Sequence, residues 1–147
     1  MANVAHHAQP RDVSTVEPEQ LVEDILAKER RIIKDSGMHV FTMRDIDERG
    51  MREVMSEALR FATDDAEGVA VSLDMDFVDP EDAPGVGTPV RGGVTYREAH
   101  LAMEMIADSK AMVSLEVVEI NPVIDEHNKT AQLGVELVLS GLGKKIL

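Results

Sequence analysis

β-prone segments alternate with amphipathic segments along this chain, and the alternation limits the folds that it can adopt. Apolar residues at helical spacing, or a capping box, predict helices over residues 19–36, 50–63, 95–109 and 130–142. Short apolar runs predict strands over residues 38–42, 69–76 and 112–120. Strands that alternate with helices in this way predict a parallel sheet with right-handed crossovers, an α/β sandwich.

Length and charge limit the number of domains and the classes of partner. We predict a polar tail over residues 1–18 and one domain over residues 19–147. The net charge of −13 opposes binding to nucleic acid or to an anionic membrane. The sequence has no cysteine, which excludes thiolate metal sites, and no apolar run or signal-peptide core, so we expect a soluble, cytoplasmic protein.

Acidic residues stand where two of the predicted strands end. In open parallel sheets ligands bind at the carboxyl ends of the strands. Asp74 and Asp76 close the second predicted strand and should leave it on the same face. Two carboxylates so close together are stable mainly with a cation between them, and oxygen ligands favour manganese, magnesium or calcium. The spacing alone is equally compatible with a pair of solvated acids.

The loop after this strand is long for a compact domain. It runs from Phe77 to Gly93 and is rich in glycine and proline. Loops of this length without secondary structure are usually functional. Glu119, at the end of the third predicted strand, adds a further carboxylate near the same edge of the sheet.

Four ordered motifs resemble the ureohydrolase family, which includes arginases and agmatinases. They are SLDMDFVDP at 72–80, APGVGTP at 83–89, GGVTYRE at 92–98 and VEINP at 118–122. Tyr96-Arg97-Glu98 and the segment 125–145 are most similar to bacterial arginases. The resemblance covers about residues 28–147. It implies the C-terminal half of a three-layer α-β-α sandwich with a parallel sheet, the arginase-like fold.

The resemblance also implies roles for particular residues. Asp74 and Asp76 match the aspartates that bind a pair of manganese ions. Glu119 matches the glutamate that pairs with the substrate guanidinium, as the catalytic and substrate-binding residue. Thr88 matches a threonine near the substrate. Asp24 and Glu29 match acids that reach toward the substrate α-amino group, although Leu26 replaces an acid of the family motif.

The implied activity is hydrolysis of L-arginine to L-ornithine and urea by metal-activated hydroxide. The family motifs Gly-Gly-Asp-His and Asp-Ala-His-x-Asp do not occur in this sequence, so we expect an incomplete metal site. The expected partners are a guanidino substrate and either further copies of the chain or a complementing N-terminal half. Two alternatives stay open: a truncated, non-catalytic paralogue or interaction subunit, and a hydrolase of agmatine or another guanidino compound.

Overall fold

The computed structural model describes the backbone of residues 18–145 and the side chains of residues 26–145. The predicted tail therefore lies outside the described residues, apart from Pro18. Contacts divide the chain into two units, residues 1–38 and 39–147. In the first unit, α1 (Pro18–Ser36) confirms the helix predicted over 19–36. Its described side chains are exposed, and Arg31 and Asp35 form an ion pair at 3.5 Å.

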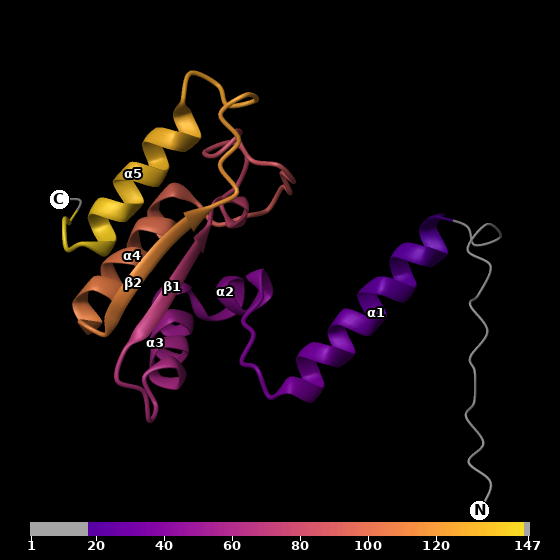
Figure 1. Cartoon of the computed structure of the whole chain (residues 1–147), viewed down its shortest axis with the longest axis horizontal. Helices are drawn as coiled ribbons and strands as arrows, with labels where there is room; N and C mark the ends of the chain where they lie inside the picture. The colour runs from indigo at the N-terminus through magenta and orange to yellow at the C-terminus, as the bar shows by residue number, and fades with distance from the viewer. Residues whose placement is uncertain (1–17, 146–147) are drawn as a thin grey trace, which may run out of the picture. The chain divides into compact units, whose positions relative to one another are not determined.

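The second unit contains two parallel strands, β1 (Val69–Asp74) and β2 (Met112–Val118). Four helices accompany them: α2 (Met43–Arg49), α3 (Met51–Ala62), α4 (Tyr96–Ser109) and α5 (Lys129–Gly141) (Figure 1). The parallel sheet and the helices confirm the predicted α/β class. None of the helices in the described part of the chain is long and apolar enough to cross a membrane.

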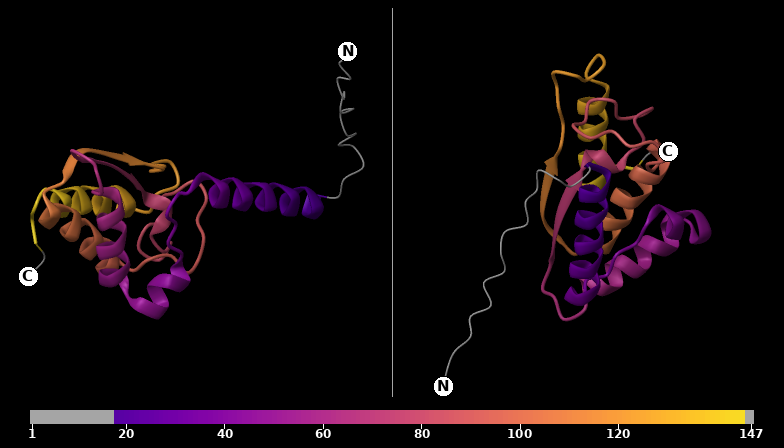
Figure 2. Two further views of the ribbon diagram at one scale, coloured as in Figure 1. Left: turned by 90° about the horizontal axis from the view of Figure 1, so that it is seen from below. Right: turned by 90° about the vertical axis from the view of Figure 1, so that its right-hand side faces the viewer.

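Helices α3, α4 and α5 all cover one face of the sheet (Figure 2). Leu73 and Val117, which are paired in the register, contribute to the core on this face. Met103 of α4 and Leu137 of α5 are almost completely buried against them. The opposite face is exposed and lined by small or polar residues, namely Ala70, Ser72, Ser114 and Glu116. Within the second unit the sheet therefore has one helical layer.

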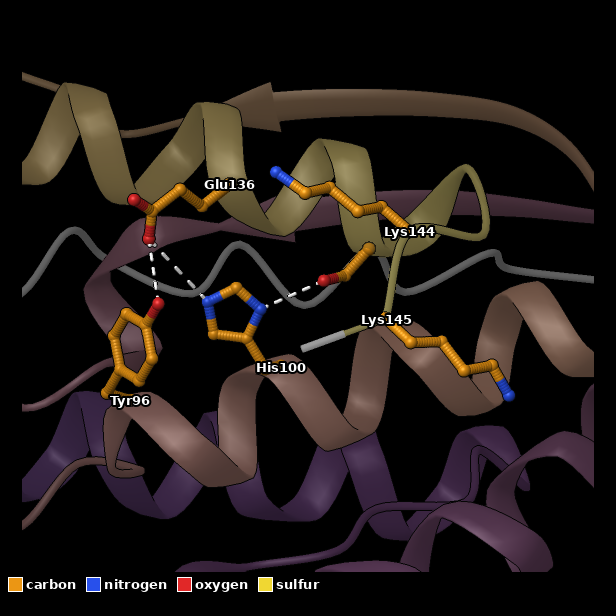
Figure 3. Close-up of a pocket in the computed structure, with 6 residues that line it drawn as sticks. Tyr96, His100, Glu136, Lys144 and Lys145 are labelled. Atoms are coloured by element: carbon orange, nitrogen blue, oxygen red, sulfur yellow. Dashed lines mark hydrogen bonds and ion pairs between the residues drawn. The ribbon is translucent and has the colours of Figure 1, made fainter. Parts of the chain in front are cut away.

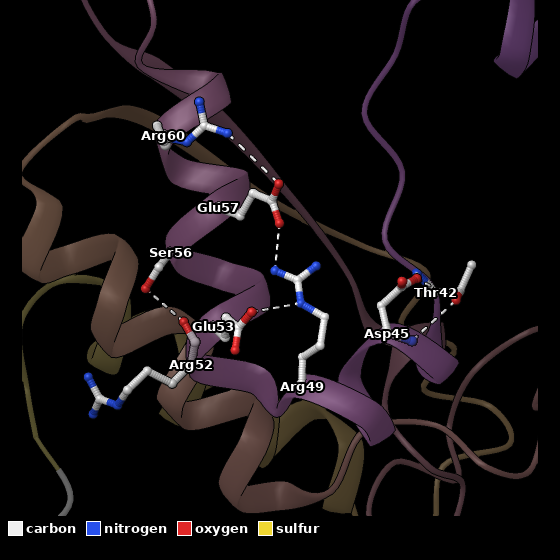
Figure 4. Close-up of polar contacts among 8 residues, drawn as sticks. All are labelled: Thr42, Asp45, Arg49, Arg52, Glu53, Ser56, Glu57 and Arg60. Carbon is white, nitrogen blue, oxygen red and sulfur yellow. Dashed lines mark hydrogen bonds and ion pairs between the residues drawn. The ribbon is translucent and has the colours of Figure 1, made fainter.

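The strand predicted over 38–42 is wrong. This segment has no regular structure, and the short helix α2 follows it. A β-prone segment forms a strand only when a neighbour satisfies its backbone groups, and no strand lies beside it within the described residues. Thr42 instead caps α2 through a capping box with Asp45 (Figure 4).

Helices α2 and α3 meet at Gly50, whose φ of +81° a residue with a side chain rarely adopts. Arg49 spans the junction. Its guanidinium donates to Glu53 at 3.0 Å and to Glu57 at 2.5 Å, and both glutamates lie on α3 (Figure 4). The ion pairs therefore hold α2 against the first turns of α3, whose observed bounds agree with the helix predicted over 50–63.

A polar cluster lies between α4 and α5, within the helical layer (Figure 3). His100 is 1% exposed, and its Nδ1 lies 2.9 Å from the hydroxyl of the buried Ser140. Its Nε2 is buried without a hydrogen-bond partner in the described structure and faces a carboxylate oxygen of Glu136 at 3.8 Å. That same oxygen accepts the phenol hydrogen bond of Tyr96. Burial lowers the pKa of His100, which favours the neutral ring.

Candidate functional site

Asp74 and Asp76 lie at the carboxyl end of β1, but not as two residues of one strand. β1 ends at Asp74, and the chain turns into a 3-10 helix, η2 (Met75–Phe77). Asp74 caps this turn by accepting the backbone N–H of Asp76 at 2.9 Å. The expected strand geometry is therefore wrong beyond Asp74. The turn forms because Met75 is completely buried while Asp74 satisfies the free N–H.

Asp76 has one carboxylate oxygen with a partner and one without. The hydroxyl of Thr88 donates to its Oδ2. Its Oδ1 is buried and accepts no hydrogen bond from any described residue. A desolvated, unpartnered carboxylate oxygen costs free energy unless a donor or a cation reaches it. Asp76 is therefore oriented by Thr88, with Oδ1 left to accept a ligand.

The long loop after η2 is held by Asp79. Its carboxylate accepts the backbone N–H groups of Glu81 at 2.9 Å and Gly92 at 2.8 Å, and these bonds lower the pKa of Asp79. Gly93 packs against this turn so closely that a Cβ there would lie 2.5 Å from the backbone nitrogen of Asp79. The predicted loop thus lacks helices and strands but has a fixed backbone course.

A second set of contacts ties the middle of this loop to α5 and to the end of β2. The N–H of Gly85 donates to the buried hydroxyl of Thr130 at 2.7 Å, and its carbonyl accepts the N–H of Asn121 at 2.8 Å. Asp125 accepts the N–H groups of Thr130 at 3.0 Å and Ala131 at 3.1 Å. A Cβ at Gly85 would lie 2.4 Å from the Cβ of Asp125. The loop that carries Thr88 is thereby fixed beside the end of β2.

Glu119 follows β2 directly, at the same edge of the sheet as Asp74. It is exposed, and its φ of +63° is unusual for a residue with a side chain. Its Oε2 lies 3.6 Å from the position that a Cβ of Gly87 would occupy. Glu119 therefore lies next to the loop that carries Thr88, and a backbone strain of about 1–2 kcal/mol is accepted there.

Comparison with known proteins decides the family. A profile described as the Arginase family matches residues 13–143. The arginase of Bacillus subtilis is 56% identical over 119 residues, which are 81% of this chain and 40% of that protein. The arginase of Bacillus caldovelox is 49% identical, with the same coverage. A solved structure of the Bacillus subtilis arginase superposes with a TM-score of 0.78 at 55% identity, covering 81% of this chain and 42% of that one.

This chain belongs to the arginase family. The resemblance and the fold predicted from the motifs are thus confirmed, including the partial length: the chain spans about 40% of the relatives that it matches. The arginase-like sheet of this chain brings Asp74, Asp76, Thr88 and Glu119 to one end of two adjacent strands.

The donors present fit part of the manganese site that the arginase resemblance implies. Asp74 is exposed, and Asp76 holds a buried oxygen without a partner in the described structure, so both offer hard oxygen ligands. In the described range 26–145, no group of three or more His, Asp or Glu side chains could hold a metal ion. The two aspartates therefore fit as members of a larger ligand set.

The remaining candidates belong to the first unit. Glu29 is exposed on α1, and the side chain of Asp24 lies outside the described residues, so both roles stay predictions. The arginase motifs did not reveal that Asp79, Asp125 and Thr130 fix the loops of the site. An Asp-Pro-Glu run signals the local turn at Asp79. No local signal announces the contact of Thr130 with Gly85, because it spans 45 residues.

Proposed function

We propose that this chain supplies the C-terminal part of a manganese-dependent arginase site that hydrolyses L-arginine to L-ornithine and urea. The observation that carries the proposal is the buried, unpartnered Oδ1 of Asp76, held beside Asp74 at the carboxyl end of a parallel strand. Relatives named arginase, 49% and 56% identical to the chain, support the substrate class. The ligands still needed would come from the part of the arginase fold that this chain does not span.

Asp74 and Asp76 would hold the metal. Manganese, when bound, would supply the Lewis acid that activates the attacking water. The Thr88 hydroxyl fixes the plane of the Asp76 carboxylate, so that Oδ1 faces a bound cation without reorganisation. Thr88 thus acts on the metal ligand, and contact with the substrate is its second proposed role.

Glu119 would bind the substrate guanidinium. A carboxylate and a guanidinium form charge-assisted, often bidentate hydrogen bonds, which fix the orientation of the planar group. The unusual backbone conformation of Glu119 directs it from the strand end toward the loop of Gly87 and Thr88. Glu29 and Asp24 are proposed to recognise the α-amino group, which would distinguish arginine from agmatine.

The central test combines the purified chain with the segment of Bacillus subtilis arginase that the chain does not match, in the presence of manganese. We expect urea release from L-arginine. Replacing both Asp74 and Asp76 with Asn should lower the rate by at least ~100-fold and reduce bound manganese, because ligand charge and geometry are lost together.

The matched control is Asp64→Asn with Glu67→Gln. These exposed residues precede β1 at its opposite end, and the pair removes the same number of charges. Equal manganese content and equal rates in the two double variants would contradict the metal site. The assay also includes agmatine, and faster release of urea from agmatine would change the proposed substrate.

A second variant tests the role of Glu119. Glu119→Gln should reduce kcat/KM by roughly 10- to 100-fold, the value of a lost charged hydrogen bond, while manganese content stays unchanged. Glu116→Gln, an exposed glutamate on β2, is the control. A parallel loss of manganese in Glu119→Gln would make this residue a metal ligand instead of a substrate contact.

A further inference from the structure

Helix α5 presents an apolar stripe to solvent. Val135 is 62% exposed, Leu139 38% and Leu142 70%, and their spacing of four and three residues places them on one side of the helix. Such a side is normally buried, because an amphipathic helix covers its apolar stripe with a neighbour. Here no described residue covers these side chains.

The stripe continues into a groove beside β2. Side chains from the end of the strand, Val117 and Ile120, line it together with α5 residues that include Val135, Val138 and Leu139. All the residues that line the groove are apolar or glycine. The groove therefore offers hydrophobic contact without a polar group that would need a specific partner.

The backbone edge of β2 next to this helix is also without a partner. β2 pairs with β1 along one edge, and no other strand of the described structure pairs with it. Parallel sheets are usually larger and covered on both faces, and an open edge presents unpaired N–H and C=O groups. The edge and the groove together can accept a strand and the helix connected to it.

We propose that the open edge of β2 and the apolar stripe of α5 form one docking surface, which binds a strand–helix unit from the part of the arginase fold that this chain does not span. The inference rests on the proposed function for the identity of the occupant. The matched relatives have more than half of their length outside the region that this chain covers. A second copy of this chain fits less well, because two copies would each bring a net charge of −13.

The other open surface of the sheet is a weaker anchor. The face that carries Ala70, Ser72, Ser114 and Glu116 is small and polar, so covering it removes little apolar area from water. It permits close approach of a second layer but supplies little driving force. The docking energy should therefore come mainly from the stripe of α5.

Sedimentation and fluorescence anisotropy can test the surface with the full chain and the unmatched segment of Bacillus subtilis arginase as the probe. We expect a complex whose Kd rises at least tenfold in both Val135→Glu and Leu139→Glu. Val135 is so exposed that its replacement should leave folding intact, which circular dichroism verifies. Val123→Glu, on the loop after β2 at 89% exposure, is the matched control and should bind like the wild type.

Each result separates the surface from the catalytic proposal. A complex that is sensitive to Val135→Glu but releases no urea would uphold the docking surface and reject the proposed function. No complex with the wild-type chain, or equal affinity in all four proteins, would overturn the docking surface. Self-association of the chain that Val135→Glu abolishes, without binding of the segment, would overturn the proposed occupant.

Discussion

Two regions of the second unit each contain a buried polar atom without a hydrogen-bond partner among the described residues. At the strand ends it is Oδ1 of Asp76, and between α4 and α5 it is Nε2 of His100. Both atoms belong to side chains whose other polar atom is bonded to a hydroxyl, of Thr88 and Ser140 respectively. The similarity of the two arrangements makes the difference in their chemistry informative.

The difference lies in what each group can do about its missing partner. An imidazole can stay neutral, and burial lowers the pKa of His100 so that it does. An ionised carboxylate has no neutral alternative at pH 7 at its ordinary pKa, and a cation satisfies it best. The unpartnered oxygen therefore indicates a ligand, whereas the unpartnered nitrogen indicates a region whose stability depends on protonation.

The largest effect concerns the strand-end region. Without the rest of the arginase fold, the chain should hydrolyse L-arginine no faster than manganese alone, even with excess metal. Fixing the reacting groups accounts for much of such catalysis, so the complemented enzyme should be faster by ~10⁵-fold or more. Urea production by the purified chain alone, measured against a metal-only blank, would show that the site is complete within it.

The next effect compares two glycines of the same loop. Gly85→Ala should destabilise the chain by about 1–3 kcal/mol, because the new Cβ would lie 2.4 Å from Asp125 and must displace either the loop or α5. Gly87→Ala should cost much less, since a Cβ there has only Glu119 within 4 Å. Urea denaturation followed by circular dichroism measures both. Similar midpoints for the two variants would contradict the tight loop packing.

Local sequence patterns could predict the elements but not the contacts between them. The capping box at Thr95 and Glu98 and the apolar runs of β1 and β2 are determined by neighbouring residues, and all are observed. The strand expected at 38–42 depends on a partner strand, and the sequence pattern cannot show whether one is present. The 3-10 turn at Asp76 depends on the burial of Met75, which is a tertiary effect.

The same limit applies to the candidate site. Family motifs predicted Asp74, Asp76, Thr88 and Glu119 as site residues, and the structure brings them to one end of the sheet. The bond from Thr88 to Asp76 joins residues 12 apart across an irregular loop, so no periodicity could reveal it. What the sequence predicted was which residues meet, and what it could not predict was which of their atoms would remain without a partner.

The third effect should appear in the helical region as a pH dependence. Because burial lowers the pKa of His100 below its ordinary value, the unfolded chain binds the proton more readily than the folded chain. Stability is then fully present above about pH 6.5 and falls as the pH drops toward the folded pKa, by at most about 1.4 kcal/mol per pH unit. Urea denaturation of the wild type between pH 7.5 and 5.5 should show this fall.

His100→Gln isolates the contribution of this one group. The variant keeps a polar side chain near Ser140 but cannot titrate, so its stability should change less over the same pH range. The groups that face His100 are Tyr96 and Ser140 in direct contact, Glu136 at 3.8 Å, and Arg97 and Glu104 through their charges. An identical pH dependence in wild type and variant would assign the fall to these other groups or to His39 and His127.

The smallest effect distinguishes an exposed acceptor from a buried one. Burial raises the pKa of Tyr96, so its phenol stays protonated and donates to Glu136 at 2.9 Å. Because the Glu136 side chain is 50% exposed, water can replace that donor in Tyr96→Phe, and we expect a loss of only about 0.5 kcal/mol. Thr88→Val removes the corresponding donor from Asp76, whose Oδ1 is already buried and unpartnered within the described chain, so it should weaken manganese binding by the complemented enzyme by roughly tenfold or more. Denaturation midpoints and manganese titrations of both variants test the contrast. If Thr88→Val leaves manganese affinity unchanged, Thr88 does not orient the ligand, and the two regions differ less than their chemistry implies.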